Sequence, residues 1–436
     1  MMIPREGTNL DPWYGLYAGR TAGLSASEVR ALFAVASRPE VVSLAGGMPF
    51  VSALPLERVT ASMERVMRKQ GARALQYGSG QGTPELREHI LEVMALEGVR
   101  ACVDDVVVTT GSQQALDLIA KLFLDSGDVV LAESPSYVGA MGVFRSYQAE
   151  VSHVAMDDDG MLPQALIERI ASLRARGRTI KFLYLIPNFH NPAGVTLSWE
   201  RRLEIVDIAR REGILIIEDN PYGLLWFDRP APHAMRSVET DGIVYLGSFS
   251  KTLAPGFRIG WALAPHGIRE KLVLAAESAI LSPSVINELI VSDYLANTDW
   301  KGQIDTYRGL YRERRDAMID ALQHYLPELQ WTMPNGGFYI WVTMPEGLDS
   351  RQMLPRAVKE LVAYTPGTAF FADGAGRTNL RLSYCYPTPA EIREGIRRLA
   401  GVVRDEQELL STFSPTGAVD SVLPSSHVIS PPPQLG

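Results

Sequence analysis

Four side chains that could act on one ligand stand close together in residues 248–261. Ser248, Ser250, Lys251 and Arg258 supply two hydroxyls, an amine and a guanidinium in a loop that contains Gly and Pro and follows a predicted strand. A lysine amine ordinarily titrates near ~10.4, becomes a nucleophile when its pKa falls, and forms an imine with an aldehyde. The hydroxyls and Arg258 can hold a phosphate through charge-assisted hydrogen bonds. The alternative is a solvated loop lysine beside a salt-bridged arginine.

A second phosphate-binding feature is predicted at Gly111, Ser112 and Gln113, between the strand 106–109 and a helix that runs to about residue 124. Unpaired N–H groups at a helix start, with the positive end of the helix dipole, bind anions without side-chain charge. A Gly-Ser pair before a helix is by itself usually only an N-cap. The feature becomes informative because Arg258 offers a second group for the same phosphate.

Asp219 stands at the end of the strand 214–217, after Glu218, so its carboxylate should face a cleft and not the core. A carboxylate beside a pyridine nitrogen keeps that nitrogen protonated, as the ring of pyridoxal 5′-phosphate (PLP) requires when it acts as an electron sink. Asp219 is therefore the candidate partner of such a ring. Capping of the following turn is the alternative role.

Three further side chains follow predicted strands and could contact the ring. Asn191 lies in a turn fixed by two prolines, and its amide could bond the phenolic oxygen of the ring together with Tyr222. Tyr137 could stack on the ring, which contributes about 0.5–1.5 kcal/mol beyond burial. Taken singly, such residues would more often form an Asn-Pro turn and a core aromatic.

Short apolar, β-branched runs alternate with longer helix-like stretches and must position these groups. This alternation predicts a largely parallel sheet covered on both faces, which binds ligands at the carboxyl ends of its strands. Residues 267–326 are rich in Leu, Ala, Glu and Arg and predict long helices that link two domains. The clearest strand candidates are 106–109, 129–132, 182–186, 214–217 and 244–246, followed by 337–342 and 380–383 after the helical stretch.

The same pattern divides the chain into four parts. Residues 1–50 form an N-terminal segment near the site, 51–315 a large PLP-binding domain, and 316–411 a smaller α+β domain. The last helix of the small domain, 389–404, begins after Thr388 as its N-cap. The end of the chain, 412–436, is rich in Pro and Ser and has little periodic apolar content, which predicts a disordered tail.

Composition argues against several classes of protein. A chain of 436 residues with 46% hydrophobic content can bury a large core. Its 42 basic and 50 acidic side chains give a formal charge of -8, which offers no basic surplus for nucleic acid or anionic lipid. The two cysteines, Cys102 and Cys385, lack the spacing of a disulfide framework or a metal site. We recognise no signal peptide and no long uncharged apolar run, so we expect a cytoplasmic protein that does not enter membranes.

The order and intervals of Asn191, Asp219, Tyr222 and Lys251 resemble those of the fold-type I, class I/II aminotransferases. Over about residues 20–405 the chain is similar to the branch that includes kynurenine/2-aminoadipate aminotransferases and the effector domains of MocR-type regulators. The resemblance implies an α/β fold, with helices flanking a mostly parallel sheet in a large domain and a smaller α+β domain. It also implies that Lys251 binds PLP covalently and moves the proton at the substrate Cα.

The resemblance assigns further residues. Tyr77 is similar to a tyrosine that reaches the phosphate from the neighbouring subunit, which implies a homodimer with shared active sites. Arg381 matches the arginine that binds the substrate α-carboxylate, where a planar fork is needed, although a strand arginine can also point outward. Gly47 resembles part of a mobile segment over the substrate, and Arg20 is a candidate for the side-chain pocket. By the same resemblance the phosphate is held by Ser112, Gln113, Ser248, Ser250 and Arg258.

The implied reaction is ping-pong transamination. It moves the amino group of an aromatic, 2-aminoadipate or branched/aliphatic L-amino acid to a 2-oxo acid such as 2-oxoglutarate or pyruvate. The same residues also serve non-transaminating fold-type I enzymes, namely decarboxylases, racemases, aldolases and cyclases, because PLP supplies the electron sink in all of them. A third interpretation is a MocR-like regulator that senses amino acids. Such proteins place DNA-binding helices before this fold, and here the resemblance begins by about residue 20.

Overall fold

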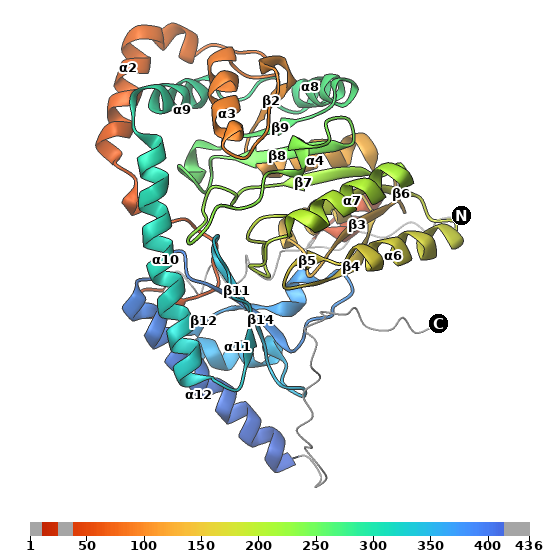
Figure 1. The fold of residues 1–436 in the computed structure, drawn as a ribbon, viewed down its shortest axis with the longest axis vertical. Coiled ribbons are helices and arrows are strands. Elements are labelled where there is room, and N and C mark those ends of the chain that lie inside the picture. The colour runs from red at the N-terminus through yellow and green to blue at the C-terminus, as the bar shows by residue number, and fades with distance from the viewer. Residues whose placement is uncertain (1–10, 25–37, 414–436) are drawn as a thin grey trace.

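The computed structural model describes residues 11–24 and 38–413 (Figure 1). It contains a large eight-stranded sheet, a four-stranded sheet and a pair of short strands. The predicted α/β fold class is confirmed, with a mostly parallel large sheet and a smaller antiparallel one. Of the predicted tail, only residues 412 and 413 are described, and they end a helix.

The large sheet is parallel through its centre and antiparallel at both edges. Its central strands are buried along their length, as expected where helices cover both faces. Residues 150–157 and 260–263 form strands that the sequence did not single out. In spatial order the strands are β2 (Val106–Thr109), β9 (Gly260–Leu263), β8 (Ile243–Ser248), β7 (Leu215–Asp219), β6 (Ile180–Leu185), β3 (Val129–Ser134), β4 (Glu150–Asp157) and β5 (Gly160–Met161).

Alternate side chains of these strands enter different cores, because successive residues of a strand point to opposite faces. Ile217 packs in a cluster with α4 (Ser112–Phe123), α5 (Val138–Ser146) and α8 (His266–Ile280). Its neighbour Ile216 packs in a second cluster with two other helices. Those helices are α6 (Pro163–Ala175) and α7 (Trp199–Glu212).

Three separate helices fill the stretch predicted as helical at 267–326. After α8, Leu281 adopts a left-handed φ of 67° before α9 (Val285–Asn297) begins. Asp299 then caps α10 (Trp300–Tyr325) by accepting a hydrogen bond from the N–H of Gly302 at 3.0 Å. In Figure 1, α10 runs from the level of the large sheet down past the small one. The predicted boundary at 315/316 falls inside this helix, and the domain division stays a prediction.

The smaller sheet is antiparallel throughout. Thr388 caps the last helix as predicted, since its Oγ1 accepts from the N–H of Glu391 at 3.3 Å while the Glu391 carboxylate accepts from the Thr388 N–H at 2.7 Å. The strands are, in spatial order, β10 (Gln330–Trp331), β11 (Tyr339–Thr343), β14 (Asn379–Ser383) and β13 (Thr365–Pro366), and the helices beside them are α11 (Ser350–Lys359) and α12 (Pro389–Phe413).

The N-terminal segment joins the small sheet region to the large one. Its strand β1 (Val42–Ser43) pairs in parallel with β12 (Val362–Ala363), and the carbonyl of Gly47, four residues further on, accepts a hydrogen bond from Lys251, which follows β8 of the large sheet. The first helices of the large unit, α2 (Leu56–Ala74) and α3 (Pro84–Ala95), pack against α9. No helix within the described residues is long and apolar enough to cross a membrane.

Candidate active site

A cavity of about 370 Å³ lies where β2, β3, β6, β7 and β8 end, between the two sheets. Parallel strands deliver their carboxyl ends to one edge of a sheet, so residues far apart in sequence meet there. The predicted site residues that line the cavity are Gly47, Ser112, Gln113, Tyr137, Asn191, Asp219, Tyr222, Ser248, Ser250, Lys251, Arg258 and Arg381.

Lys251 presents a primary amine to the cavity. It is half-buried, and its Nζ donates a hydrogen bond to the backbone carbonyl of Gly47 at 3.0 Å. Burial lowers the pKa of Lys251, and the charges of Arg381 and Arg258 lower it further, while Cys385 acts in the opposite direction. A lowered pKa increases the share of neutral amine, which is the form that attacks an aldehyde or accepts a proton.

One end of the cavity is built to hold an anion. Helix α4 begins at Ser112, after Gly111 with φ +75°, and its first N–H groups have no helical carbonyl partner. A Cβ on Gly111 would lie 2.5 Å from Arg258 Nη2, so only glycine lets this guanidinium approach the helix start. The Oγ atoms of Ser248 and Ser250 lie 2.8 Å apart at the same end.

Asp219 places a buried carboxylate in the wall of the cavity. Its Oδ2 accepts a hydrogen bond from the Tyr184 hydroxyl at 2.7 Å, while Oδ1 has no hydrogen-bond partner among the described residues. Burial raises the pKa of Asp219 to about 6, although the bond from Tyr184 opposes that rise. A buried carboxylate oxygen without a partner costs about 1–3 kcal/mol, so this one is poised for a donor that enters the cavity.

Three tyrosines line the middle of the cavity. Tyr222 and Tyr339 place their hydroxyl oxygens 3.4 Å apart, and Tyr137 donates to Oε1 of Gln113 at 3.4 Å. Burial, with the charge of Asp219, raises the pKa of Tyr137 to about 12, so this tyrosine stays protonated. The cavity therefore offers aromatic surface and hydroxyl groups around its centre.

Arg381 closes the side toward the small sheet. Its guanidinium donates to Asn191 Oδ1 at 2.8 Å and to the carbonyl of Ala45 at 2.6 Å, and it lies over the ring of Tyr339 at 4.1 Å. Its Nε has no hydrogen-bond partner among the described residues. A buried planar cation of this kind suits a carboxylate, which can accept two parallel hydrogen bonds.

Three predicted residues do not line the cavity. Gly111 lies behind it, against Arg258. Arg20 belongs to the 3₁₀ turn Gly19–Gly23, which packs against α5, so Arg20 does not reach the cavity of its own chain. Tyr77 is exposed at the surface.

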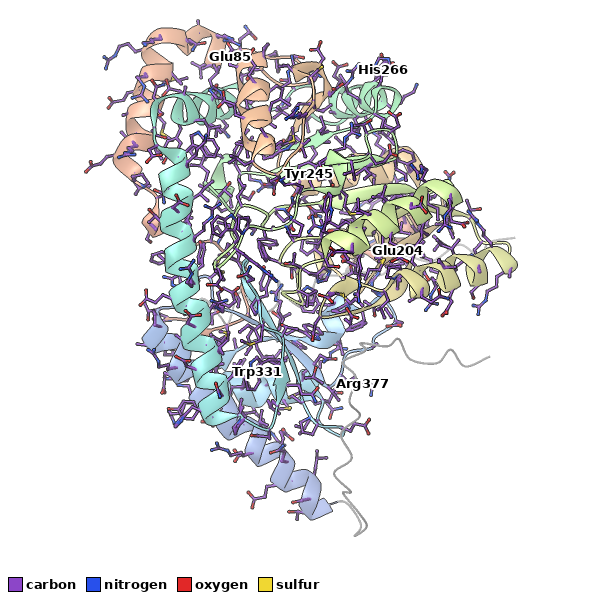
Figure 2. All side chains as sticks on the ribbon, in the orientation of Figure 1. Glu85, Glu204, Tyr245, His266, Trp331 and Arg377 are labelled. Atoms are coloured by element: carbon purple, nitrogen blue, oxygen red, sulfur yellow. The ribbon has the colours of Figure 1, made fainter. Side chains whose placement is uncertain are left out.

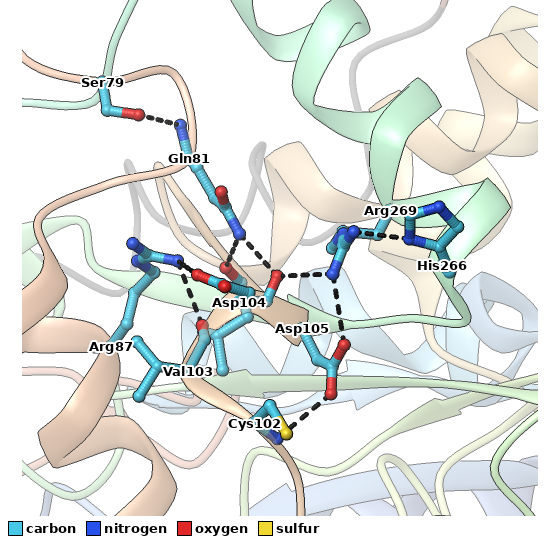
Figure 3. Close-up of polar contacts among 10 residues, drawn as sticks. Ser79, Gln81, Arg87, Cys102, Val103, Asp104, Asp105, His266 and Arg269 are labelled. Carbon is cyan, nitrogen blue, oxygen red and sulfur yellow. Dashed lines mark hydrogen bonds and ion pairs between the residues drawn. The ribbon is translucent and has the colours of Figure 1, made fainter.

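The loop that carries Tyr77 is tied to the start of β2 (Figure 3). Nε2 of Gln81 donates to the carbonyls of Asp104 and Val106 at 2.7 and 3.0 Å, and Arg269 donates to the same Asp104 carbonyl at 3.0 Å. Helix α4 begins three residues after the end of β2. The bonds to the start of β2 therefore hold the Tyr77 loop in a fixed position relative to the anion-binding end of the cavity.

Sequence reasoning missed two tyrosines at this site. Tyr339 lies on β11, within a run that the sequence marked only as a strand of the small domain. Tyr184 lies inside β6 and touches Asp219 from the neighbouring strand β7. Both are aromatic residues in apolar runs, which are typical of a core, so only the pairing of the strands reveals them.

Three features of the cavity fit PLP. Oδ1 of Asp219 can accept a hydrogen bond from a protonated ring nitrogen. The start of α4, with Arg258, Ser248 and Ser250, can bind a phosphate. Lys251 supplies an amine that can react with an aldehyde. Within the described residues no group of three or more His, Cys, Asp or Glu side chains is placed to hold a metal ion.

Comparison with known proteins gives consistent matches. Residues 40–399 match the family described as aminotransferase class I and II. Aromatic-amino-acid aminotransferase 1 of Thermococcus litoralis is 39% identical over 90% of this chain and 95% of its own length, and 2-aminoadipate transaminase of Thermus thermophilus is 37% identical over 90% and 96%. The crystal structure of Pyrococcus horikoshii kynurenine aminotransferase in complex with PMP is 37% identical, with a TM-score of 0.86 over 89% of this chain and 97% of that one.

Proposed function

Because this chain belongs to the class I and II aminotransferases and is a PLP-dependent enzyme, we propose that it transfers the amino group of aromatic or 2-aminoadipate-type L-amino acids to a 2-oxo acid in a ping-pong cycle. One observation carries the proposal. A single cavity joins the Lys251 amine, an unpaired Asp219 oxygen, an anion-binding helix start and the guanidinium of Arg381. The relatives named above act on aromatic and 2-aminoadipate donors, which supports the substrate class.

In the proposed role, PLP when bound supplies an electron sink for the charge that develops at the substrate Cα. Ser112, Ser248 and Arg258 would hold its phosphate, and Asn191 and Tyr222 would bond the phenolic oxygen of its ring. Asp219 would keep the ring nitrogen protonated. Lys251 would anchor the cofactor and then accept and return the Cα proton, a task that its lowered pKa favours.

The proposed homodimer is supported by the surface around Tyr77. Tyr77 is 77% exposed, and Leu75 and Leu281 beside it are 71% and 55% exposed, which is costly for large apolar groups in a lone chain. The N–H of Gly78 bonds Ser282 Oγ at 3.4 Å, so these segments form one surface. We propose that a second copy covers this surface and receives Tyr77 at its anion-binding end.

The proposed substrate class is tested by half-reactions. The purified protein is mixed with single L-amino acids without any oxo acid, and its near-ultraviolet and visible absorbance is followed. Conversion of the bound cofactor to its amino form with aromatic and 2-aminoadipate donors, faster than with small aliphatic ones, is the expected result. A spectrum that amino acids perturb but never convert would contradict transamination, and sedimentation of the same sample as a monomer would contradict the dimer.

Replacing Arg381 with lysine should weaken the binding of the amino donor and of the 2-oxo acid acceptor to a similar extent. The lysine keeps the positive charge but loses the planar fork and the contacts to Asn191 and Ala45. We expect kcat/KM for donor and acceptor each to fall by about 10- to 100-fold, the equivalent of roughly 1.5–3 kcal/mol for a charged hydrogen bond. Steady-state kinetics with each substrate varied in turn measures this. An effect confined to one substrate would place Arg381 in a side-chain pocket and not at the shared carboxylate.

A further inference from the structure

A chain of buried polar side chains lies behind the cavity without lining it. We call it the Glu97 network, and it links Glu97, Asn220, Asn188 and Arg202 in that order. Oε1 of Glu97 accepts from Nδ2 of Asn220 at 2.9 Å. Oδ1 of Asn220 accepts from Nδ2 of Asn188 at 3.0 Å, and Oδ1 of Asn188 accepts from Nη2 of Arg202 at 2.5 Å.

The Glu97 network connects the two loops that carry ring-facing residues. Asn220 directly follows Asp219 at the end of β7, and Asn188 lies three residues before Asn191 after β6. Arg202 bonds the carbonyl of Pro187 at 3.0 Å and so holds the second loop from behind. Both loops are therefore held through side chains that never touch the cavity.

Glu97 itself reaches this place from a distant part of the chain. It follows the end of α3, and its own carbonyl accepts from the N–H of Ala234 at 3.0 Å. Its Oε2 accepts from the hydroxyl of Tyr245 on β8, the residue labelled inside the large unit in Figure 2. A Cβ on Gly223 would overlap Oε1 of Glu97, so the chain leaves this position without a side chain where the carboxylate approaches.

We propose that Glu97 is a positioning residue for the transamination site, which fixes Asp219 through Asn220 and the Asn191 loop through Asn188. The proposal rests on the roles given above to Asp219 and Asn191. Two donors aim at the two oxygens of one carboxylate, an arrangement that favours its ionised form. A neutral carboxyl would carry a proton toward Tyr245 or Asn220, each of which already donates there.

Several charges around Glu97 decide when it takes up a proton. Burial raises the pKa of Glu97 to about 7, the bonds from Tyr245 and Asn220 oppose the rise, Glu218 on β7 adds to it, and Arg202 on α7 opposes it. The ring of His233 lies against Gly98, the next residue of the chain. Below about pH 7 the carboxyl gains a proton and one donor must turn away, so the loops should hold the cofactor less tightly.

The test compares Glu97→Leu and Glu97→Gln with Glu218→Gln. Glu218 is the matched control, because it is also a buried carboxylate, next to Asp219, and accepts instead from the backbone N–H groups of Met235 and Arg236, both at 2.8 Å. Each cofactor-free protein is titrated with PLP, and the dissociation constant is read from absorbance across pH 5.5–8.5, about 1.5 units either side of the expected pKa.

Glu97→Leu should bind the cofactor about tenfold more weakly or worse, because it leaves the Asn220 amide with only its longer bond to the Tyr245 hydroxyl at 3.4 Å. Glu97→Gln should recover much of that loss, since its amide oxygen can still accept from Asn220, but it should lose the weakening of binding that wild type shows as pH falls through about 7. Glu218→Gln should lower the melting temperature and leave the dissociation constant above pH 7 within about twofold. It should move the weakening of binding to a lower pH without abolishing it, because the charge of Glu218 raises the pKa of Glu97.

A lower melting temperature in Glu97→Leu with wild-type cofactor affinity and pH profile would overturn the proposal, because it would make Glu97 a structural residue only. If Glu97→Leu does not fold, Tyr245→Phe and Gly223→Ala decide the question. The first removes one donor, the second displaces the carboxylate without removing a polar group, and both should weaken binding. Asp219→Asn distinguishes a failed role for Asp219 from a failed role for Glu97.

Discussion

Lys251→Ala is expected to lower the turnover number by about 10²–10⁴-fold, the range that a positioned general base contributes. No described side chain in the cavity can replace it. The other cations there, Arg258 and Arg381, are guanidiniums that do not give up their protons near neutral pH. Binding of the cofactor should survive in part, because the helix start, the serines and Asp219 remain in place.

Turnover under saturating substrates and the absorbance of the bound cofactor measure this together. The variant should show an altered spectrum, because no covalent bond to the chain can form, while Lys251→Arg serves as the control for charge. If the alanine variant kept a tenth or more of wild-type turnover, Lys251 would be neither the anchor nor the base. An inactive alanine variant with the wild-type spectrum would contradict covalent attachment of the cofactor at Lys251 and leave this residue only the role of the base.

The position of the site along the chain could be predicted because strand ends are visible in the sequence. Lys251, Asp219, Asn191 and Tyr137 each follow an apolar run, and parallel strands bring such ends to one edge. The sequence also predicted that residues 267–326 are helical, but it did not predict that they form three separate helices. The breaks at Leu281 and Asp299 come from local backbone geometry and capping that a composition argument does not contain.

What the sequence could not predict depends on contacts between elements. The hydrogen bond from Tyr184 to Asp219 exists only because β6 pairs with β7 in one register. The contact of Glu97 with Asn220 joins residues 123 positions apart, and neither has a motif that marks it. The role that the resemblance gives Arg20 stays a prediction, since the turn that carries it packs on α5 and Arg20 does not line the cavity of its own chain.

The strand β9 illustrates the same limit within the fold. Residues 260–263 run antiparallel between β2 and β8, so an edge of the sheet departs from the parallel order that the βα alternation predicts. The start of this strand packs closely against the anion-binding end of the cavity, since a Cβ on Gly260 would lie 2.6 Å from the backbone N of Ser112. Gly260, two residues after Arg258, is thus needed for the helix start to lie where it does.

Asp219→Asn is expected to lower kcat by about 10²–10³-fold, the loss seen when one electrostatic partner of a developing charge is removed. The amide has nearly the shape of the carboxylate but cannot balance a protonated ring nitrogen. Tyr184→Phe is the graded control. It keeps the carboxylate and removes only the donor at 2.7 Å, so its loss should be nearer tenfold.

The two variants should also differ in how pH changes cofactor affinity. Burial raises the pKa of Asp219 to about 6 from an ordinary 3.8, so in wild type the carboxylate is lost and binding weakens as pH falls through about 6. The Tyr184 bond lowers that pKa, so in Tyr184→Phe the weakening should begin at a higher pH. Asp219→Asn should lack this titration altogether and bind weakly at every pH.

Titration of each cofactor-free protein with PLP from pH 5 to 8, a span of about one unit below and two above this pKa, would show these differences in affinity. Wild-type turnover in Asp219→Asn would contradict the assigned role, whereas a tenfold loss in Tyr184→Phe without any shift of the profile would mean that the tyrosine places the carboxylate and does not tune its charge.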